Sequence, residues 1–388
     1  MSFLAILRTF STKNTNSSWQ RMKVLYDHQS FTGMAYGGVT RYFYELMRAF
    51  ADRYDVDFEL SLQFSNNEYL DRASFSKHRR FGLAHWRNVS RLASAVNRLY
   101  SIQRVRAGDF SVFHPTYYHN YFQRYLGTKP LVITFHDATS ERYGKRYPEV
   151  GEHLFEAKKI QMARADKIIA VSEFSKQEIL HFFPVAAEKI EVIHLGTAFS
   201  RQRSPTPSVP GVHRYLLYVG KRGLYKNFVM FFRAAQPILQ RHPDLHIYCA
   251  GGGSFTSDEM TQFQAAGLGQ RVHFRAITDS TLYTLYQHAE AFVFPSLNEG
   301  FGLPVLEAFS AGCPVVLSNR SSLPEVGADA ALYFDPEQVE SMTEAIDKVL
   351  TDTALRHQLR QRGAERITHF SCEKTAAKTL AVYQQLAG

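Results

Sequence analysis

Short apolar runs recur along this chain, and each is separated from the next by a stretch with helical periodicity. Runs of this length indicate buried strands, and strands that alternate with helices are typical of parallel α/β domains. In the first half the runs are Lys23–Tyr26, Phe58–Leu62, Val112–His114, Leu131–Phe135, Lys167–Val171 and Glu191–Ile193. In the second half they are Tyr215–Val219, Leu245–Ala250, Val272–Phe274, Ala291–Phe294, Val315–Leu317 and Leu332–Phe334. We therefore expect an α/β fold with parallel sheets.

A proline-rich break divides this alternation into two halves. The segment Ser204–Gly211 contains three prolines and cannot continue a regular element. A chain of 388 residues also exceeds the size at which a single hydrophobic core keeps growing. We predict Rossmann-like domains at 22–200 and 213–370, a linker at 201–212, and a ligand cleft between the carboxyl ends of the two sheets.

The two ends of the chain differ from these domains. Residues 1–21 contain no acidic residue, and the apolar run Phe3–Leu7 is too short for a secretory signal. We expect a disordered extension there, with an organelle transit peptide as the alternative. At the other end, Glu373–Leu386 has a helical pattern, which predicts a terminal helix at 371–388. Ser175 and Glu178 match a capping box that would open an earlier helix.

Composition narrows the cellular setting. No long uninterrupted apolar run is present, which argues against a membrane span. The three cysteines have no metal-like spacing, and Cys249 and Cys313 lie in apolar runs. Buried free thiols are typical of a reducing compartment, so we predict a cytoplasmic protein, peripheral at the inner membrane face if it binds lipid.

The net charge of +9 is concentrated in one segment. From Arg72 to Gly108 there is no Asp or Glu, while aromatic and aliphatic residues alternate with arginines that include Arg79, Arg80, Arg87 and Arg91. From Trp86 onward the apolar residues fall at helical spacing. Two interpretations stay open: a packed helix with a solvated basic face, or a patch that contacts anionic lipid. No nucleic-acid-binding signature accompanies the charge, so we do not expect a nucleic-acid partner.

Two carboxylates flank a predicted helix start in the second half. Glu299 follows the apolar run ending at Phe294, and Glu307 lies one turn into the helix that Pro304 begins. The backbone amides of Phe301, Gly302 and Leu303 lie at the positive end of this helix and would attract an anion. Carboxylates beside an anion site fit a ligand with hydroxyl groups and a phosphate, such as a sugar nucleotide.

The string Glu-Gly-Phe-Gly-Leu-Pro-Val-Leu-Glu-Ala at 299–308, followed by Ala-Gly-Cys-Pro-Val-Val at 311–316, resembles the E-x7-E signature of retaining family 4 glycosyltransferases with the GT-B fold. The resemblance implies that Glu307 binds the ribose hydroxyls and that Glu299 binds the donor sugar. It also implies that the first domain binds the acceptor, that the second binds the donor nucleotide, and that the terminal helix crosses back to the first domain.

A second cluster lies after the apolar run Tyr215–Val219. Glycines let the backbone turn sharply there, and Arg222 and Lys226 bring two cations toward the cleft. They resemble the diphosphate clamp of the family, which neutralises the leaving group without a metal. Asp55 and Asp57 match the D-x-D metal motif of another glycosyltransferase fold only superficially, so we expect no metal and no cofactor.

The remaining candidates lie at other strand ends. Gly37 and Gly38 resemble the donor-phosphate loop of the family. Taken alone, His136 fits a hydrogen-bonded structural residue equally well, but the resemblance implies that it contacts the transferred sugar. Tyr117 and Tyr118 follow another strand and are predicted to line the acceptor side. The segment ending at Ile277 is where such enzymes hold the base by backbone hydrogen bonds.

These residues, together with the resemblance, predict a metal-independent glycosyltransferase, and the resemblance implies that it retains configuration at the transferred carbon. It would move a hexose, with mannose favoured, from a nucleoside diphosphate sugar to a saccharide or polyprenyl-linked acceptor in polysaccharide or lipopolysaccharide assembly. Two alternatives use a similar cleft: a GT-B epimerase or phosphorylase, and a non-catalytic sugar-nucleotide-binding module.

Overall fold

The structure is a computed structural model that describes residues 22–54, 56–80, 87–147, 151, 153–199 and 214–387, without the side chains of Arg72 and of residues 87–89. Several sequence predictions lie outside the described part: the extension at 1–21, the linker at 201–212, Asp55, the helix start at Trp86, and the side chain of Arg87.

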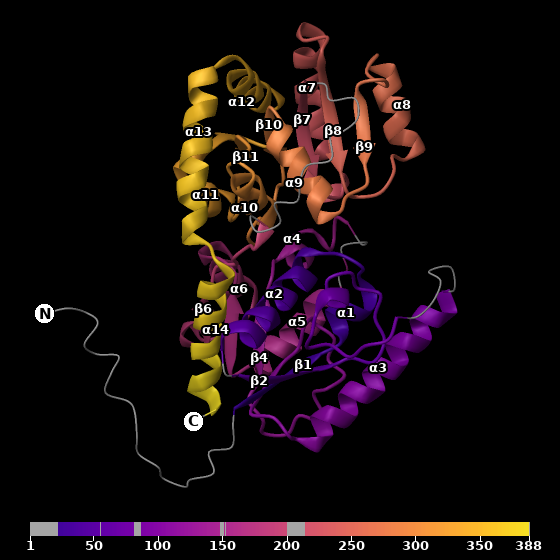
Figure 1. Cartoon of the computed structure of the whole chain (residues 1–388), viewed down its shortest axis with the longest axis vertical. Coiled ribbons are helices and arrows are strands. Elements are labelled where there is room, and N and C mark those ends of the chain that lie inside the picture. Colours follow the sequence, from indigo (N-terminus) through magenta and orange to yellow (C-terminus); the bar gives the residue numbers. More distant parts are fainter. Residues whose placement is uncertain are drawn as a thin grey trace, which may run out of the picture.

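The first domain, at the bottom of Figure 1, contains two parallel sheets of three strands. Their orders are β2-β1-β3 and β4-β5-β6, and a bridge between Phe113 and Leu131 joins them edge to edge. The strands are β1 (Lys23–Asp27), β2 (Asp57–Ser61), β3 (Val112–His114), β4 (Val132–Phe135), β5 (Lys167–Ala170) and β6 (Ile190–Val192).

The second domain contains one parallel sheet of six strands in the order β12-β11-β10-β7-β8-β9. The chain changes direction across this sheet between β7 and β10, and such a switch point is where ligands bind in doubly wound folds. The strands are β7 (Arg214–Val219), β8 (Leu245–Ala250), β9 (Val272–Arg275), β10 (Ala291–Phe294), β11 (Val315–Ser318) and β12 (Ala331–Phe334).

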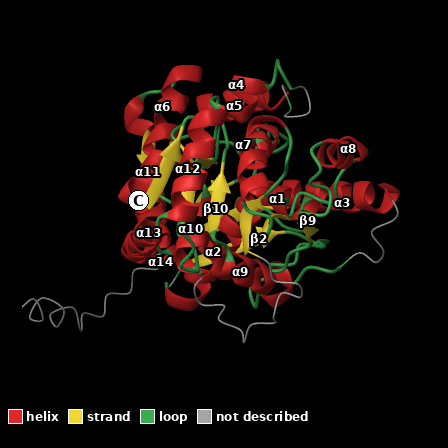
Figure 2. Cartoon of the chain, turned by 90° about the horizontal axis from the view of Figure 1, so that it is seen from above, coloured by secondary structure: helices red, strands yellow, loops and turns green. Residues whose placement is uncertain are grey.

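Helices cover the sheets on both sides, as the view from above in Figure 2 shows. In the first domain they are α1 (Gln29–Gly33), α2 (Gly38–Arg53), α3 (Arg87–Ala107), α4 (Thr139–Tyr143), α5 (His153–Arg164) and α6 (Glu173–Phe182). In the second they are α7 (Phe228–Arg241), α8 (Ser257–Ala265), α9 (Asp279–His288), α10 (Leu303–Ser310), α11 (Leu323–Gly327), α12 (Val339–Thr351) and α13 (Thr353–Arg366).

The last helix, α14 (Cys372–Ala387), leaves the second domain and packs on the first (Figure 1). The hydroxyl of Tyr383 lies 2.9 Å from that of Tyr26 in β1 and 2.6 Å from Nδ1 of His114 in β3. The chain crosses between the domains a second time near Gly196, where an added Cβ would lie 2.1 Å from the carbonyl carbon of Ser371. The two crossing segments therefore touch each other.

The predicted α/β fold with two facing Rossmann-like domains is confirmed, and each strand prediction agrees with the structure to within one residue at each end. The predicted capping box is wrong. Helix α6 begins earlier, because the side chain of Ser172 accepts a hydrogen bond from the amide of Ser175 at 2.9 Å. Glu178 forms an ion pair with Arg142 instead.

The described helices include none that is both long and apolar enough to cross a bilayer. All three cysteines are buried free thiols.

Candidate functional site

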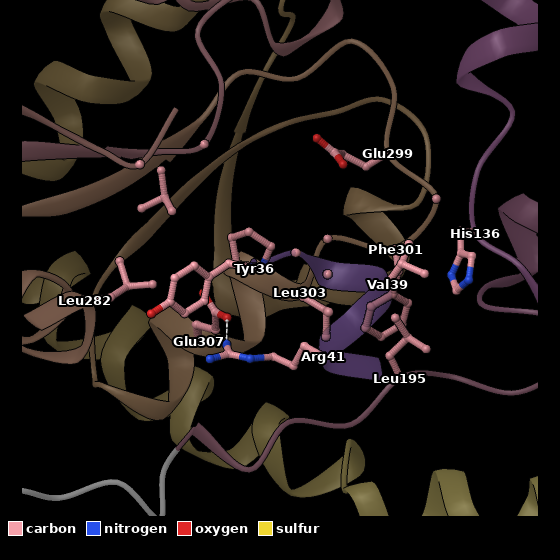
Figure 3. A pocket seen from close by; sticks show the side chains of 18 of the residues that line it. Tyr36, Val39, Arg41, His136, Leu195, Leu282, Glu299, Phe301, Leu303 and Glu307 are labelled. Carbon is pink, nitrogen blue, oxygen red and sulfur yellow. Dashed lines mark hydrogen bonds and ion pairs between the residues drawn. The ribbon is translucent and has the colours of Figure 1, made fainter. Parts of the chain in front are cut away.

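A cleft of about 510 Å³ lies between the two domains at the carboxyl ends of their strands. Most of the predicted donor and catalytic residues line it. They are Gly37, Gly38, His136, Lys226, Ile277, Glu299, Phe301, Gly302, Leu303 and Glu307. Figure 3 shows ten labelled residues of this lining, taken from both domains.

Glu307 is buried in α10, and Arg41 of α2 reaches across the cleft to form an ion pair with it (Figure 3). The same guanidinium binds Asp279 at the start of α9, and Tyr286 donates to the other oxygen of Glu307 at 3.3 Å. Burial raises the pKa of Glu307 above its usual value, although the positive charge of Arg41 opposes this effect. One buried carboxylate thus joins both domains.

Sequence reasoning missed Arg41, although it lies in the helix that follows the predicted Gly37-Gly38 loop. A signal was present: Arg41 is a charged residue within an otherwise apolar run, and Glu45 is spaced to pair with it. In the structure Glu45 pairs with Arg48, which leaves the guanidinium of Arg41 to the second domain.

Glu299 and Lys226 form a second ion pair, with 2.6 Å between Oε1 and Nζ. Burial is the largest influence and lowers the pKa of Lys226, but the charge and hydrogen bond of Glu299 together with Tyr225 and Asp137 outweigh it, and the net pKa is raised. Lys226 therefore stays protonated. Its ammonium group also lies 5.2 Å from the ring centre of Tyr225 and 5.4 Å from that of Phe294.

Helix α10 begins at this wall of the cleft. Its N-cap, Gly302, has φ of 100° and ψ of 53°, and an added Cβ would lie 2.9 Å from Leu323. Glycine is required here because other residues rarely adopt this backbone conformation. The tight turn exposes the start of the helix to the cleft, where the backbone dipoles favour an anion.

His136 is half-buried at the end of β4, against the rings of Tyr42, Phe43 and Tyr118. Burial lowers its pKa to about 4, so the imidazole is neutral at pH 7. A neutral imidazole can exchange hydrogen bonds with a sugar hydroxyl without adding a charge beside the reacting carbon.

Arg222 does not line the cleft. Its Nε donates to Glu259 at 2.7 Å, and its Nη2 donates to the carbonyl oxygen of Ser254 at 2.9 Å. The guanidinium is thus turned toward the loop that follows β8 and the start of α8. Arg222 therefore lies at the edge of the donor cleft, and its contacts with Glu259 and Ser254 hold its guanidinium outside the cleft.

The residues predicted for acceptor or membrane contact do not form one surface. Tyr117, Tyr118 and Arg91 line a second cavity in the first domain. Arg80 pairs instead with Asp71 and Glu68, and the exposed Arg79 lies outside that cavity, where its backbone pairs with Gln63.

The basic charge of the segment from Arg72 to Gly108 is therefore partly neutralised by acids outside it, since Arg104 also pairs with Glu59. Within the part of the chain that the structure describes, no group of three or more His, Cys, Asp and Glu side chains is arranged to hold a metal ion.

Two family descriptions match consecutive parts of this chain. The model for glycosyltransferase family 4 matches residues 36–201, and the model for glycosyl transferases group 1 matches residues 203–366. Among curated proteins, O-antigen chain mannosyltransferase B of Escherichia coli is 29% identical over 90% of this chain and 96% of its own length. The MMP alpha-(1->4)-mannosyltransferase of Mycolicibacterium hassiacum is 25% identical, with 72% of each chain covered.

Solved structures show the same fold. Sucrose-phosphate synthase from Thermosynechococcus elongatus aligns with a TM-score of 0.72 at 21% identity, over 94% of this chain and 99% of its own. HepE from Anabaena, solved in complex with UDP and glucose, aligns with a TM-score of 0.73 at 17% identity over the same shares.

Proposed function

We propose a particular reaction for this chain, which belongs to the group 1, family 4 glycosyltransferases and is a hexosyltransferase with the GT-B fold. The reaction is metal-independent transfer of mannose, with retention of configuration, from a nucleoside diphosphate sugar to a saccharide acceptor. The observation that carries the proposal is the placement of Glu307, Glu299 and Lys226 around one interdomain cleft.

Each wall of the cleft suits one part of the donor. Glu307 accepts hydrogen bonds from the ribose hydroxyls, and its carboxylate oxygens have further lone pairs beyond those used by Arg41 and Tyr286. Lys226 and the first amides of α10 stabilise the diphosphate. Glu299 and neutral His136 bind hydroxyls of the sugar, which lies between the two.

The transfer breaks the bond between the anomeric carbon and the diphosphate oxygen and forms a bond from that carbon to the acceptor hydroxyl on the same face. A phosphate oxygen of the leaving group takes the hydroxyl proton. Glu299 stabilises the positive charge that develops on the sugar, and Lys226 stabilises the negative charge that develops on the diphosphate. Arg222 contributes by holding the loop after β8 beside the nucleotide, and it reaches the diphosphate directly only if it leaves Glu259.

The choice of mannose rests on relatives. Both curated proteins described above are mannosyltransferases, and one of them is an O-antigen chain enzyme. We therefore place the reaction in polysaccharide or lipopolysaccharide assembly.

A thermal-shift panel of UDP-, GDP-, ADP- and dTDP-sugars tests the donor. Because a ligand that binds only the folded state stabilises it by mass action, GDP-mannose at 100 times its dissociation constant would add about 2.7 kcal/mol. Glu307→Gln removes the ribose-binding charge, so this variant should lose the shift and the transfer activity while keeping the fold. Equal stabilisation of both proteins, or turnover of donor without acceptor into an epimer, would contradict the proposal.

We also propose that α3 brings the protein to an anionic membrane surface. Leu92 and Leu99 on this helix are 65% and 67% exposed, and the basic Arg91 and Arg98 lie beside them. Apolar side chains flanked by cations are typical of helices that lie in a lipid interface. Binding to anionic liposomes at low salt should weaken in the double variant Leu92→Ser, Leu99→Ser; no binding by the unaltered protein would rule the proposal out.

A further inference from the structure

A second cavity of about 960 Å³ lies in the first domain, between α1, α3, α5 and the segment that follows β3. Its lining is strongly basic. The residues that can carry positive charge are Arg91, Arg98, Arg124, His28, His119 and His153. The described lining contains no Asp or Glu, so no carboxylate in this lining balances the positive charge of the cavity.

The three arginines are available to a ligand. None of them forms an ion pair with a carboxylate in the ranges that the structure describes, in contrast to Arg80 and Arg104 of the same basic stretch. Arg98 lies over the ring of Tyr121, with 5.9 Å to the ring centre, which orients the guanidinium without neutralising it.

The buried carboxylate of Asp27 lies behind this wall and is fully engaged elsewhere. Its oxygens accept hydrogen bonds from the backbone and hydroxyl of Thr116, the hydroxyl of Tyr121 and the side chain of Gln29. Among the described residues it therefore forms no ion pair with an arginine of the cavity.

His28 provides a second, independent sign of a missing ligand. Its side chain lines the cavity, is 5% exposed, and places Nδ1 2.9 Å from the hydroxyl of Thr32. Nε2 is buried and has no hydrogen-bond partner among the described residues. The hydroxyl of Thr32 donates to the carbonyl oxygen of His28, so it accepts from Nδ1–H, and Nε2 is a buried acceptor that lacks a donor. A buried polar atom without a partner is destabilising, and a hydroxyl group of a ligand would satisfy it.

One residue connects this cavity to the donor cleft. Tyr118 lines the second cavity, and its hydroxyl accepts a hydrogen bond from the backbone N–H of His136 at 2.9 Å. His136 in turn lines the donor cleft. The two cavities are therefore neighbours, separated at this point by a single tyrosine side chain.

We propose that the second cavity binds the phosphate or diphosphate group of a phosphorylated acceptor, with Arg91, Arg98 and Arg124 as its donors and with Nε2 of His28 accepting from a hydroxyl of the adjoining saccharide. This inference rests on the proposed function, since it assigns the acceptor of that reaction to a chemical class. Guanidinium groups suit phosphate oxygens because their N–H groups form paired, charge-assisted hydrogen bonds. The saccharide end of the acceptor then extends past Tyr117 and Tyr118 to the donor sugar.

Binding of inorganic pyrophosphate tests the site directly. The full chain is saturated with the nucleoside diphosphate identified in the donor panel, which blocks the donor cleft, and pyrophosphate is titrated by calorimetry. We expect the dissociation constant to rise at least tenfold in the double variant Arg98→Gln, Arg124→Gln, whose side chains are exposed and not needed for folding. Arg79→Gln, which removes an exposed arginine outside the cavity, is the control and should bind normally. Unchanged binding in the double variant would overturn the proposal.

Transfer assays identify the source of the phosphate. The acceptors are a soluble sugar phosphate, a polyprenyl-diphosphate-linked saccharide in vesicles, and the same saccharide without phosphate. The double variant should raise KM at least tenfold for whichever phosphorylated acceptor is used, and leave donor stabilisation and transfer to the unphosphorylated saccharide unchanged. An equal KM in variant and unaltered protein for all acceptors would overturn the proposal. If no acceptor is glycosylated and no donor stabilises the protein, the proposed function fails. The pyrophosphate titration, then run without a blocking nucleotide, still reports on the cavity through the difference between the double variant and the unaltered protein.

Discussion

At the scale of single residues, Arg41 decides the charge of the donor site. Burial favours the protonated form of Glu307, and the positive charge of Arg41 is the strongest influence that opposes it. The carboxylate must be ionised to accept hydrogen bonds from two ribose hydroxyls. Arg41 of the first domain thereby favours the ionised form of Glu307, a binding group of the second domain.

Replacing Arg41 should change the pH dependence of catalysis. In Arg41→Met the pKa of Glu307 rises further, because burial and the negative charge of Asp279 remain and only the hydrogen bond from Tyr286 still opposes them. The acid limb of the kcat/KM profile for the donor should therefore move to higher pH, and Arg41→Lys, which keeps the charge, should move it less. Identical acid limbs in all three proteins would show that Arg41 does not control Glu307.

Two histidines, the buried His114 and the half-buried His136, make stability depend on pH. Burial lowers the pKa of His114 to about 3 and that of His136 to about 4, below the usual 6.5. The unfolded chain then gains protons near pH 6.5, whereas the folded protein does not until pH 3–4. Stability from these groups is therefore complete above pH 6.5 and is lost as the pH falls toward 4.

Because the pKa of each histidine is lower in the folded than in the unfolded state, lowering the pH from 7 to 5 should reduce the free energy of unfolding by about 2 kcal/mol for each of them. Urea unfolding at several pH values measures this loss. His114→Gln should be less stable at pH 7, because hydrogen bonds to Tyr383 and Thr134 are disturbed, but should lose less on acidification. The same slope in both proteins would contradict the assignment.

At the scale of elements, the start of α6 is built from both domains. Ser172 caps the helix and also donates to the carbonyl oxygen of Gly300 at 2.6 Å. Glu325 of α11 accepts hydrogen bonds from the first amides of α6, those of Glu173 and Phe174. A carboxylate at a helix N-terminus is favourable, so this contact joins the domains as well as completing the helix.

Ser172→Ala should therefore act on the cleft as well as on the helix. Loss of an N-cap costs about 1 kcal/mol of unfolding free energy, and loss of the bond to Gly300 loosens the wall that contains Glu299. Asp352→Ala is the matched control, because it removes the cap of α13 away from the cleft. Both variants should lower the Tm, and only Ser172→Ala should raise the donor KM. A raised KM in both would mean that the effect is general destabilisation.

At the scale of the whole molecule, the two domains meet through backbone at the site. A Cβ added to Gly300 would lie 1.6 Å from the carbonyl oxygen of His136, so only glycine permits this approach. The contact sets the spacing between His136 and Glu299, which belong to different domains and are proposed to bind the same sugar.

Gly300→Ala should force the domains apart. The backbone of His136 cannot move aside as a flexible side chain would, so we expect kcat to fall at least tenfold while each domain keeps its fold. Gly269→Ala is the control, since the neighbour nearest to its added Cβ would be Gln264, in ordinary contact with Cγ at 3.4 Å, and Gly269 does not line the cleft. Small-angle scattering and initial rates measure the two effects. Unchanged activity in Gly300→Ala would show that the contact is not needed for catalysis.

The sequence alone determined the strands, the two-domain fold and the contiguous donor motif. Hydrophobic runs and the spacing of Glu299, Phe301 and Glu307 are local patterns, and a strand or a helix start depends mainly on its own residues. His136, Lys226 and the glycine loop were found for the same reason, since each lies in a segment that follows a strand and the segments after parallel strands converge on one cleft.

Only the tertiary structure decided which side chains meet. Arg41 and Glu307 are 266 positions apart, and their pairing requires the domains to be placed against each other. Arg222 was predicted in the cleft, but contacts with Glu259 and Ser254 turn it outward. The second cavity brings together α1, α3 and α5, so its basic lining has no single sequence motif. Local periodicity specifies elements, whereas the partners of a charged side chain depend on the packing of residues far apart in the chain.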